Sequence, residues 1–263
     1  DEKKYVRAAE RSATFILNTL DKDDRLMRYY RRGQTIEKAF LDDYAFLTMG
    51  QLDLYEATFD DKWLVEAKKL GEQIVELFSD GEEGGFFLAG KDSEKLIART
   101  KPNSDGAVPS GNSVAALALL KLGRLTMNRR FEEQADKVLD AFSVQLEQSP
   151  AYSTAMLEAL SFSLGPGSEI IIAGSGGAAD TQQMLKLARS KFMPNTIVLL
   201  HDQGNADASL YELIPFVKKQ TVVEGKATAY VCQSYACKKP VNTIGQFEQM
   251  LAAIGPKEMQ RSK

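Results

Sequence analysis

The stretch LYEATFDDKWLVEAKKL, residues 54–70, recurs 68 residues later as LGRLTMNRRFEEQADKVL, residues 122–139. In both copies the apolar residues follow the spacing of an amphipathic helix. The matched pairs are Leu54 and Leu122, Thr58 and Thr126, Trp63 and Phe131, Ala67 and Ala135, and Ile74 and Phe142. A repeat of this length, built from helices, predicts a stack of helical hairpins that share a continuous core.

The same spacing predicts six helices in the first part of the chain. They are expected at about 5–20, 42–59, 62–78, 112–127, 131–146 and 152–164. The first helix also matches the helix at 62–78 when the sequence is shifted by 58 residues, which aligns Tyr5 with Trp63 and Leu20 with Phe78. The segments 42–58, 112–127 and 152–164 consist of smaller and more apolar residues, which is typical of helices in an inner layer. The other helices are larger and amphipathic, which is typical of an outer layer. The chain therefore predicts three helical hairpins over residues 1–164.

Two segments between these helices are predicted to be β-hairpins near one rim of the stack. They are RLMRYYRRG, residues 25–33, and GGFFLAGKDSEKLIARTKP, residues 84–102, where short apolar runs flank polar residues. Both bring aromatic residues and arginine to the rim, which suits a sugar or another polar ligand. Packing alone also explains such residues.

The composition changes at Gly165, and the rest of the chain alternates between strands and helices. Strands are expected in SEIIIAGS, TIVLLHD and ATAYVCQ, with helices between them and a last helix in NTIGQFEQMLAAI. This alternation predicts a small α/β unit with a parallel sheet over residues 165–263. The predicted fold class is thus mostly α, followed by this unit.

Composition limits the classes of partner. The chain has 263 residues, of which 44% are hydrophobic and 26% charged, with a net charge of −3 and no basic block. A nucleic-acid partner is therefore not expected. No apolar run approaches the roughly 20 residues that span a bilayer, so no membrane partner is expected either. With one histidine and two cysteines, no metal site or cofactor is expected, and we predict a cytoplasmic protein.

The turn DGAVPSGN, residues 105–112, supplies the candidate site. Under the 68-residue shift, Asp42 and Asp43 fall on Ser110 and Gly111, so both segments should lie at the same rim, where helix N-termini offer free N–H groups. The candidate catalytic residues are Asp42, Asp43 and Asp105. The candidate substrate-binding residues are Tyr44, Arg99, Ser110, Asn112 and Glu158. The alternative is that Asp42, Ser110 and Asn112 are helix caps and nothing else.

Two further patterns lie in the α/β unit. Residues 174–179 fit G-x-G-x-x-A after a strand, and Asp202 ends the next strand, but this lone glycine motif is weak evidence for a nucleotide site. Cys232 and Cys237 are redox candidates only as partners of a redox module, because their spacing is not the C-x-x-C of a thioredoxin active site. In a reducing cytosol we expect both to be free thiols.

Three stretches together resemble the C-terminal part of the YyaL-like family, bacterial relatives of the spermatogenesis-associated thioredoxin-like protein. They are LDDYAFL (41–47) with LYEATFDDKWL (54–64), GGFFLAG to DGAVPSGNSVAA (84–116), and TAYVCQSYAC (228–237). The resemblance implies a partial (α/α) toroid, similar to N-acylglucosamine 2-epimerases and six-hairpin glycosidases. It also implies an upstream thioredoxin-fold domain, which is absent from this sequence, so the chain resembles a C-terminal fragment.

Two functions are predicted. The first is the binding of a sugar-like or similar polar metabolite at the rim, with glycoside-hydrolase-like chemistry as an extension that needs two facing carboxyl groups. The second is a non-catalytic domain that serves the upstream thioredoxin-fold module, with Cys232 and Cys237 as its redox partners. Because three hairpins leave apolar flanks at both ends of the stack, we also expect self-association through the first helix, as a symmetric dimer.

Overall fold

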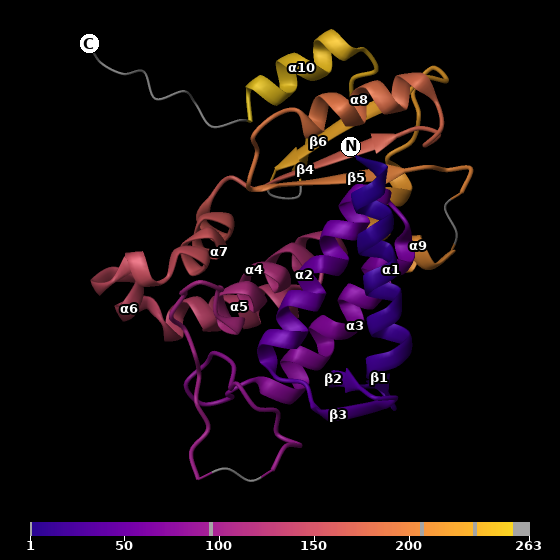
Figure 1. Ribbon diagram of the computed structural model, residues 1–263. Helices are drawn as coiled ribbons and strands as arrows, with labels where there is room; N and C mark the ends of the chain where they lie inside the picture. Colours follow the sequence, from indigo (N-terminus) through magenta and orange to yellow (C-terminus); the bar gives the residue numbers. More distant parts are fainter. Residues whose placement is uncertain (1, 95–96, 206–207, 234–235, 255–263) are drawn as a thin grey trace. The chain divides into compact units, whose positions relative to one another are not determined.

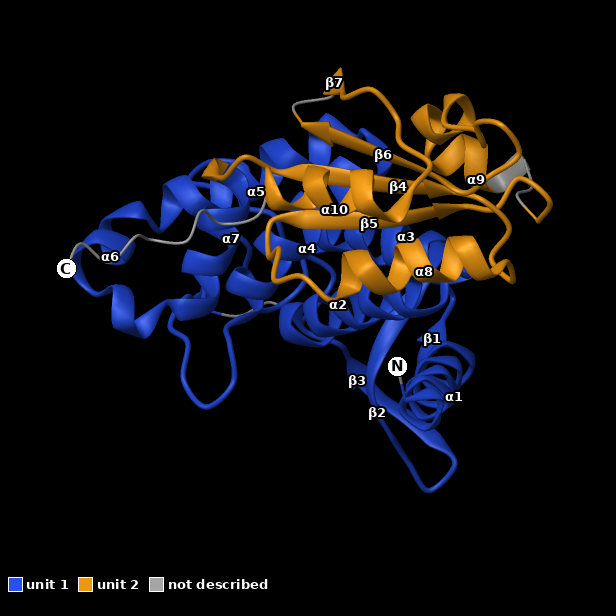
Figure 2. Cartoon of the chain, turned by 90° about the horizontal axis from the view of Figure 1, so that it is seen from above, with its two compact units in different colours: residues 1–163 blue, residues 164–263 orange. Residues whose placement is uncertain are grey.

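The computed structural model describes residues 2–94, 97–205, 208–233 and 236–254. The chain divides into two compact units, unit 1 from Asp1 to Ser163 and unit 2 from Leu164 to Lys263 (Figure 2). Among the helices in these described stretches, none has both the length and the apolar character needed to cross a membrane.

Unit 1 consists of helices with one antiparallel sheet near its start (Figure 1). Its helices are α1 (Lys3–Leu20), α2 (Leu41–Thr58), α3 (Asp61–Phe78), α4 (Gly111–Thr126), α5 (Arg129–Ala141), α6 (Ser143–Gln148) and α7 (Thr154–Leu164), with a 3-10 turn at Pro150–Tyr152. The strands β1 (Asp21–Lys22), β2 (Arg25–Arg31) and β3 (Gln34–Lys38) pair in the order β1-β2-β3. The predicted hairpin at 25–33 is therefore present, and it extends to Lys38.

The helices form an inner and an outer layer. Helix α2 packs against both α3 and α4, and α4 packs against α5. Helix α4 is buried along nearly its whole length, whereas α3 and α5 each bury one stripe of apolar residues. A helix that is apolar all round belongs in the interior, and an amphipathic one belongs at its surface. The interior position of α4 and the surface positions of α3 and α5 agree with the predicted layering.

The sequence repeat is also a repeat of hydrogen bonds. At the end of the inner helix, Thr58 Oγ1 donates to the Leu54 carbonyl and Thr126 Oγ1 donates to the Leu122 carbonyl, each at 2.7 Å. The next residues, Phe59 and Met127, both adopt a left-handed conformation, with φ of 55° and 54°. The following side chains, of Asp60 and Asn128, both accept a bond from the N–H two residues on. The two hairpins thus share their turn geometry, 68 residues apart.

Two expectations for unit 1 are wrong. The helix expected at 131–146 breaks at Phe142, and its two parts are α5 and α6. The segment 84–102 is not a β-hairpin, because its described residues form no strand apart from an isolated bridge between Ser79 and Phe86. Between its described arms one backbone hydrogen bond is found, from the Leu88 N–H to the Thr100 carbonyl. The apolar residues of this segment are used to cover the helices instead of pairing as strands.

Unit 2 contains the sheet predicted after Gly165. Its elements are β4 (Ser168–Ala173), α8 (Ala179–Arg189), β5 (Thr196–His201), α9 (Ala208–Leu213), a 3-10 helix (Pro215–Lys219), β6 (Thr228–Gln233), β7 (Ala236–Cys237) and α10 (Ile244–Ala252). All six residues of β4 are buried, as expected for a central strand with a continuous apolar run.

The sheet is mixed, so the expectation of a parallel sheet is wrong. The strand order is β5-β4-β6-β7. Strand β4 is parallel to β5, antiparallel to β6 on its other side, and β7 returns antiparallel to β6. A strand–helix–strand pattern predicts the parallel pair correctly. It does not show that the third strand crosses to the far side of the first and runs the other way.

Candidate functional site

The N-termini of α2 and α4 lie side by side, as the repeat predicts. A Cβ atom built on Gly111 would lie 2.2 Å from Asp42 Oδ1 and 3.0 Å from Leu41 Cγ. Only glycine therefore allows the two helix ends to approach so closely. We call this junction of the first turns of α2 and α4 the rim.

Asp42 is the rim carboxylate with the unusual environment. It is half-buried, and its Oδ1 is buried without a hydrogen-bond partner among the described residues. Burial and the neighbouring charge of Asp43 raise the pKa of Asp42, although the Gly111 N–H and the charge of Arg28 act in the opposite direction. Raised carboxyl pKa values are typical of functional sites, where a proton must be held or transferred.

Asp43 and Tyr44, the next two residues, hold the local fold together. Asp43 Oδ2 accepts a 2.8 Å hydrogen bond from the Phe40 N–H, which closes the first turn of α2. The Tyr44 hydroxyl accepts bonds from the Leu26 N–H and from Arg25 Nη1, at 2.9 and 3.0 Å. Tyr44 is fully buried, and burial raises its pKa. The Tyr44 hydroxyl thus fastens β2 to α2, so the expectation that Tyr44 contacts a ligand is not supported by its position.

Asp105 joins two helix ends. Its Oδ1 accepts bonds from the Ser110 N–H and from Ser113 Oγ, and its Oδ2 accepts a bond from the Ala155 N–H, each at 2.8 Å. Both carboxylate oxygens are thus used to cap the first turns of α4 and α7. This arrangement explains why an acid begins the DGAVPSGN turn.

Ser110 and Asn112 also act as structural residues. Ser110 Oγ accepts a bond from the Ser113 N–H, so Ser110 is the N-cap of α4. Asn112 is fully buried; its Oδ1 accepts from the Phe86 N–H, and its Nδ2 donates to the Phe86 and Pro102 carbonyls. Asn112 therefore replaces the strand pairing that the 84–102 segment lacks. The capping alternative therefore describes Ser110, whereas Asn112 binds the backbone of the 84–102 segment.

The last two predicted binding residues lie at the surface. Arg99 donates to the Ala89 carbonyl and stacks 3.9 Å from the centre of the Phe87 ring. Glu158 is an exposed residue of α7. No described contact joins either of them to Asp42.

A pocket of about 440 Å³ lies beside the first turn of α2, and the sequence did not reveal it. Its lining residues are Glu37, Lys38, Phe40, Leu88, Ala89, Asp92, Ser93, Glu94 and Thr100. Ser93 Oγ is buried without a partner among the described residues. Asp92 pairs with Arg25 and Lys38, both at 2.9 Å, and these partners hold its pKa at about 2 against the effect of burial. We call this the rim pocket.

The rim pocket could be found only from tertiary structure. The Arg28 guanidinium lies 4.4 Å from the centre of the Phe40 ring, so an aromatic face and a cation meet at the pocket's edge. Residues 37–40 and 88–100 are far apart in the sequence, and no motif joins them. The weak signal available was the aromatic and arginine content of the two inter-helix segments.

The glycine-rich turn of unit 2 is closed by acidic side chains. Asp202 Oδ2 accepts from the Gly176 N–H at 2.8 Å, and Asp180 Oδ2 accepts from the Ala227 N–H at 2.8 Å. These backbone bonds lower the pKa of both carboxyl groups. The Gly176 N–H, which would otherwise be free to bind a phosphate, thus already donates to the Asp202 carboxylate. The geometry argues against a nucleotide at this turn.

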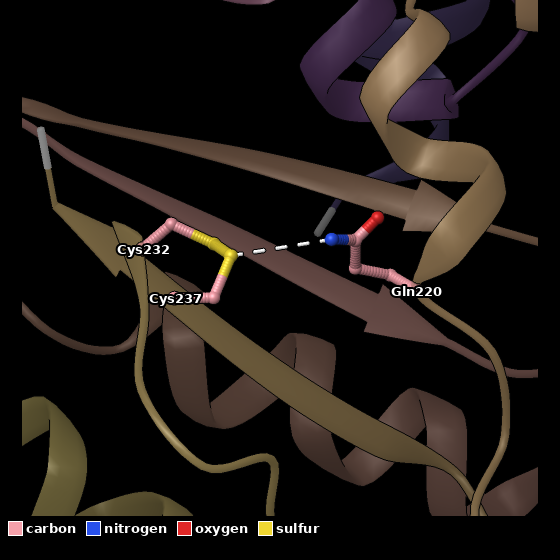
Figure 3. The surroundings of a disulfide bond; sticks show 3 residues. All are labelled: Gln220, Cys232 and Cys237. Carbon is pink, nitrogen blue, oxygen red and sulfur yellow. Dashed lines mark hydrogen bonds between the residues drawn. A yellow bond between two sulfur atoms is a disulfide. The ribbon is translucent and has the colours of Figure 1, made fainter. Parts of the chain in front are cut away.

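Cys232 and Cys237 form a disulfide, so the expectation of two free thiols is wrong (Figure 3). The two residues are directly opposite each other in the β6–β7 ladder, which brings their side chains together on one face. Cys232 is only 4% exposed, whereas Cys237 is exposed. Gln220 Nε2 lies 4.0 Å from Cys237 Sγ. The opposite amide orientation would instead let Gln220 donate to the Phe216 and Val217 carbonyls.

No protein-family model matches the chain. Its sequence is 35% identical to human spermatogenesis-associated protein 20 over 236 residues, which is 86% of this chain and 30% of the human protein. It is 33% identical to the rat protein of the same name over 259 residues, 94% of this chain and 33% of that protein. An uncharacterized Caenorhabditis elegans protein is 28% identical over 95% of this chain. The chain spans about a third of the length of these relatives.

Proposed function

We propose that this chain, whose sequence is similar to about a third of spermatogenesis-associated protein 20, binds a small, polar, sugar-like ligand in the rim pocket. The observation that carries the proposal is the composition of the pocket wall. Phe40 and Leu88 offer an apolar surface, while Glu37, Glu94 and Thr100 surround it with hydrogen-bonding groups. An apolar floor with a few placed polar groups is the usual make-up of a small-ligand site.

Calorimetry with a panel of neutral mono- and disaccharides tests this proposal. We expect the Phe40→Leu variant, which keeps the apolar volume but removes the aromatic face, to bind about tenfold more weakly, a loss of about 1.4 kcal/mol. Phe192→Leu is the matched control, because Phe192 is a highly exposed phenylalanine of unit 2. Equal affinities of the Phe40→Leu variant and the wild type, or no saccharide bound at millimolar concentration, would contradict the proposal.

We propose Asp42 as the titrating group beside this pocket. The direction in which its titration changes the free energy of unfolding with pH follows from its raised pKa. A raised pKa means that the folded state favours the protonated form. Its stabilising contribution is then fully present below the ordinary value of 3.8 and is lost as the pH rises through the raised pKa. We therefore expect Asp42→Asn to be more stable than the wild type at pH 7 in urea unfolding, with the difference shrinking towards pH 3.5. A variant less stable at pH 7 would show that the Asp42 charge is structural.

Hydrolysis by two carboxyl groups is not part of the proposal. The mechanism needs one acid and one base or nucleophile on either side of the scissile bond. Asp43 and Asp105 are both occupied by backbone N–H groups. Asp42 is thus the one predicted catalytic residue with an unsatisfied carboxylate oxygen. We propose ligand binding beside Asp42, whose raised pKa comes from burial and the charge of Asp43.

The disulfide supports a second candidate function, exchange with a thioredoxin-type dithiol. A thiolate of that partner attacks Cys237 Sγ, the exposed sulfur, and Cys232 leaves as a thiolate that takes up a proton. The partner's second thiol then attacks its own sulfur in the mixed disulfide and releases Cys237. Two electrons pass to this disulfide, and the partner is left oxidised. Lys238 and Lys239, which follow Cys237, favour the thiolate form.

Trapping experiments determine which of the two cysteines, Cys232 or Cys237, reacts with the thioredoxin. With a thioredoxin that lacks its resolving cysteine, we expect Cys232→Ser, which leaves the exposed Cys237 free, to give a mixed disulfide after mild oxidation. Cys237→Ser leaves only the buried Cys232 and serves as the matched control, with at least tenfold less product on a non-reducing gel. Equal trapping by both variants, or by neither, would argue against directed exchange at Cys237.

A further inference from the structure

The wall of the rim pocket keeps more hydrogen-bond acceptors than donors available for a ligand. Ser93 Oγ is buried and has no partner among the described residues. No hydrogen bond or ion pair joins the carboxylate of its neighbour Glu94 to another described residue. A carboxylate accepts about four hydrogen bonds and donates none, whereas a hydroxyl both accepts and donates. An occupant of this pocket must therefore supply donors above all.

Asp92 is the carboxylate of the wall that is already paired. Arg25 Nε and Lys38 Nζ each lie 2.9 Å from its Oδ2, and Arg25 Nη2 donates to its Oδ1 at 3.3 Å. Lys38 Nζ also donates to the Asp92 carbonyl at 2.7 Å. Lys38 is the one cationic residue among the described residues of the wall, and Asp92 engages it. These residues therefore leave no free cation in the wall to bind an anionic ligand.

Glu37 carries the third carboxylate of the wall, and its contacts are long. Its Oε2 lies 4.0 Å from Arg28 Nη1, and its Oε1 accepts from the Tyr29 hydroxyl at 3.5 Å. Both distances exceed the roughly 2.5–3.2 Å of ordinary hydrogen bonds. The Arg28 and Glu37 side chains are 42% and 55% exposed, so water screens this pair and weakens it. Glu37 thus keeps most of its accepting capacity for a ligand.

The backbone also holds Glu37 in an unusual conformation. Its φ of 59° is left-handed, although the residue lies within strand β3. The other described non-glycine residues with positive φ lie in turns or at the ends of helices. In the register of β2 and β3, Arg28 and Glu37 are not paired, although the positions on either side of them are. Strained residues of this kind are concentrated at sites that bind or transform ligands.

We infer that the ligand of the rim pocket carries a protonated amine, which binds at the carboxylates of Glu37 and Glu94 and at Ser93 Oγ. The inference rests on the proposed sugar-binding function and names the class of sugar that the pocket selects, an aminated one. An ammonium group supplies three donors and no acceptor, which complements this wall. A sugar carboxylate or phosphate would instead meet carboxylates of its own charge, and like charges at close range repel.

Calorimetry with a matched set of sugars tests the inference. The set is glucose, its 2-amino, 3-amino and 6-amino derivatives, and glucuronate, so that a hydroxyl, an ammonium group and a carboxylate are compared on one ring. We expect at least one amino derivative to bind about tenfold more tightly than glucose, and glucuronate to bind about tenfold more weakly. In about 1 M salt both differences should shrink, because the screening length falls to about 3 Å.

Two variants assign this preference to the carboxylates. Glu37→Gln and Glu94→Gln keep the size of the side chain and remove its charge. We expect each to lower the affinity for the amino derivative more than that for glucose, so that the ratio of the two falls about fivefold. Glu147→Gln is the matched control, because Glu147 is an exposed glutamate of α6 outside the pocket wall, and it should keep the wild-type ratio.

The outcomes separate this inference from the proposed function. If no sugar of the set binds at millimolar concentration, the proposed function fails and the inference fails with it. If glucose binds but no amino derivative binds more tightly, or if glucuronate binds as well as glucose, the inference alone is overturned. The same holds if both glutamine variants keep the wild-type ratio. Circular dichroism of each variant verifies that it is folded.

Discussion

Replacing Asn112 by alanine should lower the free energy of unfolding of unit 1 by about 4 kcal/mol. The substitution removes one acceptor and two donors from a fully buried site. It leaves the Phe86 N–H, the Phe86 carbonyl and the Pro102 carbonyl without their partner. A buried polar group left unsatisfied costs about 1–3 kcal/mol, so three such groups account for the expected size.

Urea unfolding followed by tryptophan fluorescence measures this loss, because the single tryptophan, Trp63, is buried in unit 1. Asn18→Ala is the matched control, since Asn18 is exposed on α1. There we expect a change of no more than about 0.5 kcal/mol, in the stabilising direction, because alanine is the better helix former. An Asn112 variant that unfolded like the control would contradict the structural role assigned to this amide.

Replacing Asp105 by alanine should cost about 3 kcal/mol, equivalent to roughly 10 °C in the melting temperature of a unit of this size. The carboxylate accepts three hydrogen bonds and caps α4 and α7 at once. Bonds to a charged group contribute about 1.5–3 kcal/mol each, and part of this is recovered when water solvates the freed N–H groups.

Two measurements on the Asp105 variant separate a structural role from a binding role. Asp140→Ala, at an exposed position of α5, should leave the melting temperature within about 2 °C of the wild type. Saccharide affinity at a temperature where the Asp105 variant is folded should equal that of the wild type. Weaker saccharide binding with an unchanged melting temperature would instead show that Asp105 is a ligand-binding residue.

The helices of unit 1 could be predicted because their information is local. The apolar period and the 68-residue repeat placed α2, α3 and α4 within one or two residues of their observed ends. The break at Phe142 and the lack of strands in 84–102 could not be predicted, because both depend on tertiary contacts. Asn112 supplies the hydrogen bonds for Phe86 that a strand partner would otherwise give. The direction of β6 was missed because alternation of strands and helices does not determine it.

The meeting of the two helix ends was predicted from the repeat, but the rim pocket was not, because none of the predicted site residues lines it. The repeat correctly brought Asp42 beside Gly111. It could not distinguish Asp42, whose Oδ1 has no partner, from Asp43 and Asp105, whose oxygens accept backbone N–H groups. All three are aspartates near the start of a helix, and an aspartate at such a position is equally suited to capping the helix and to catalysis. The difference lies in distances that only the folded chain defines.

The position of β4 in the middle of its sheet has a consequence for biosynthesis. Ser168 of β4 pairs with Gln233 of β6, so one edge of β4 stays unpaired until the ribosome has released nearly the whole of unit 2. The hairpins of unit 1 involve neighbouring segments and can form while the chain emerges, since local contacts fold first. Meanwhile the isoleucine run at 170–172, buried in the finished sheet, is exposed. During synthesis this run is therefore the part of unit 2 that is most open to aggregation, because exposed apolar segments of unfinished domains associate readily.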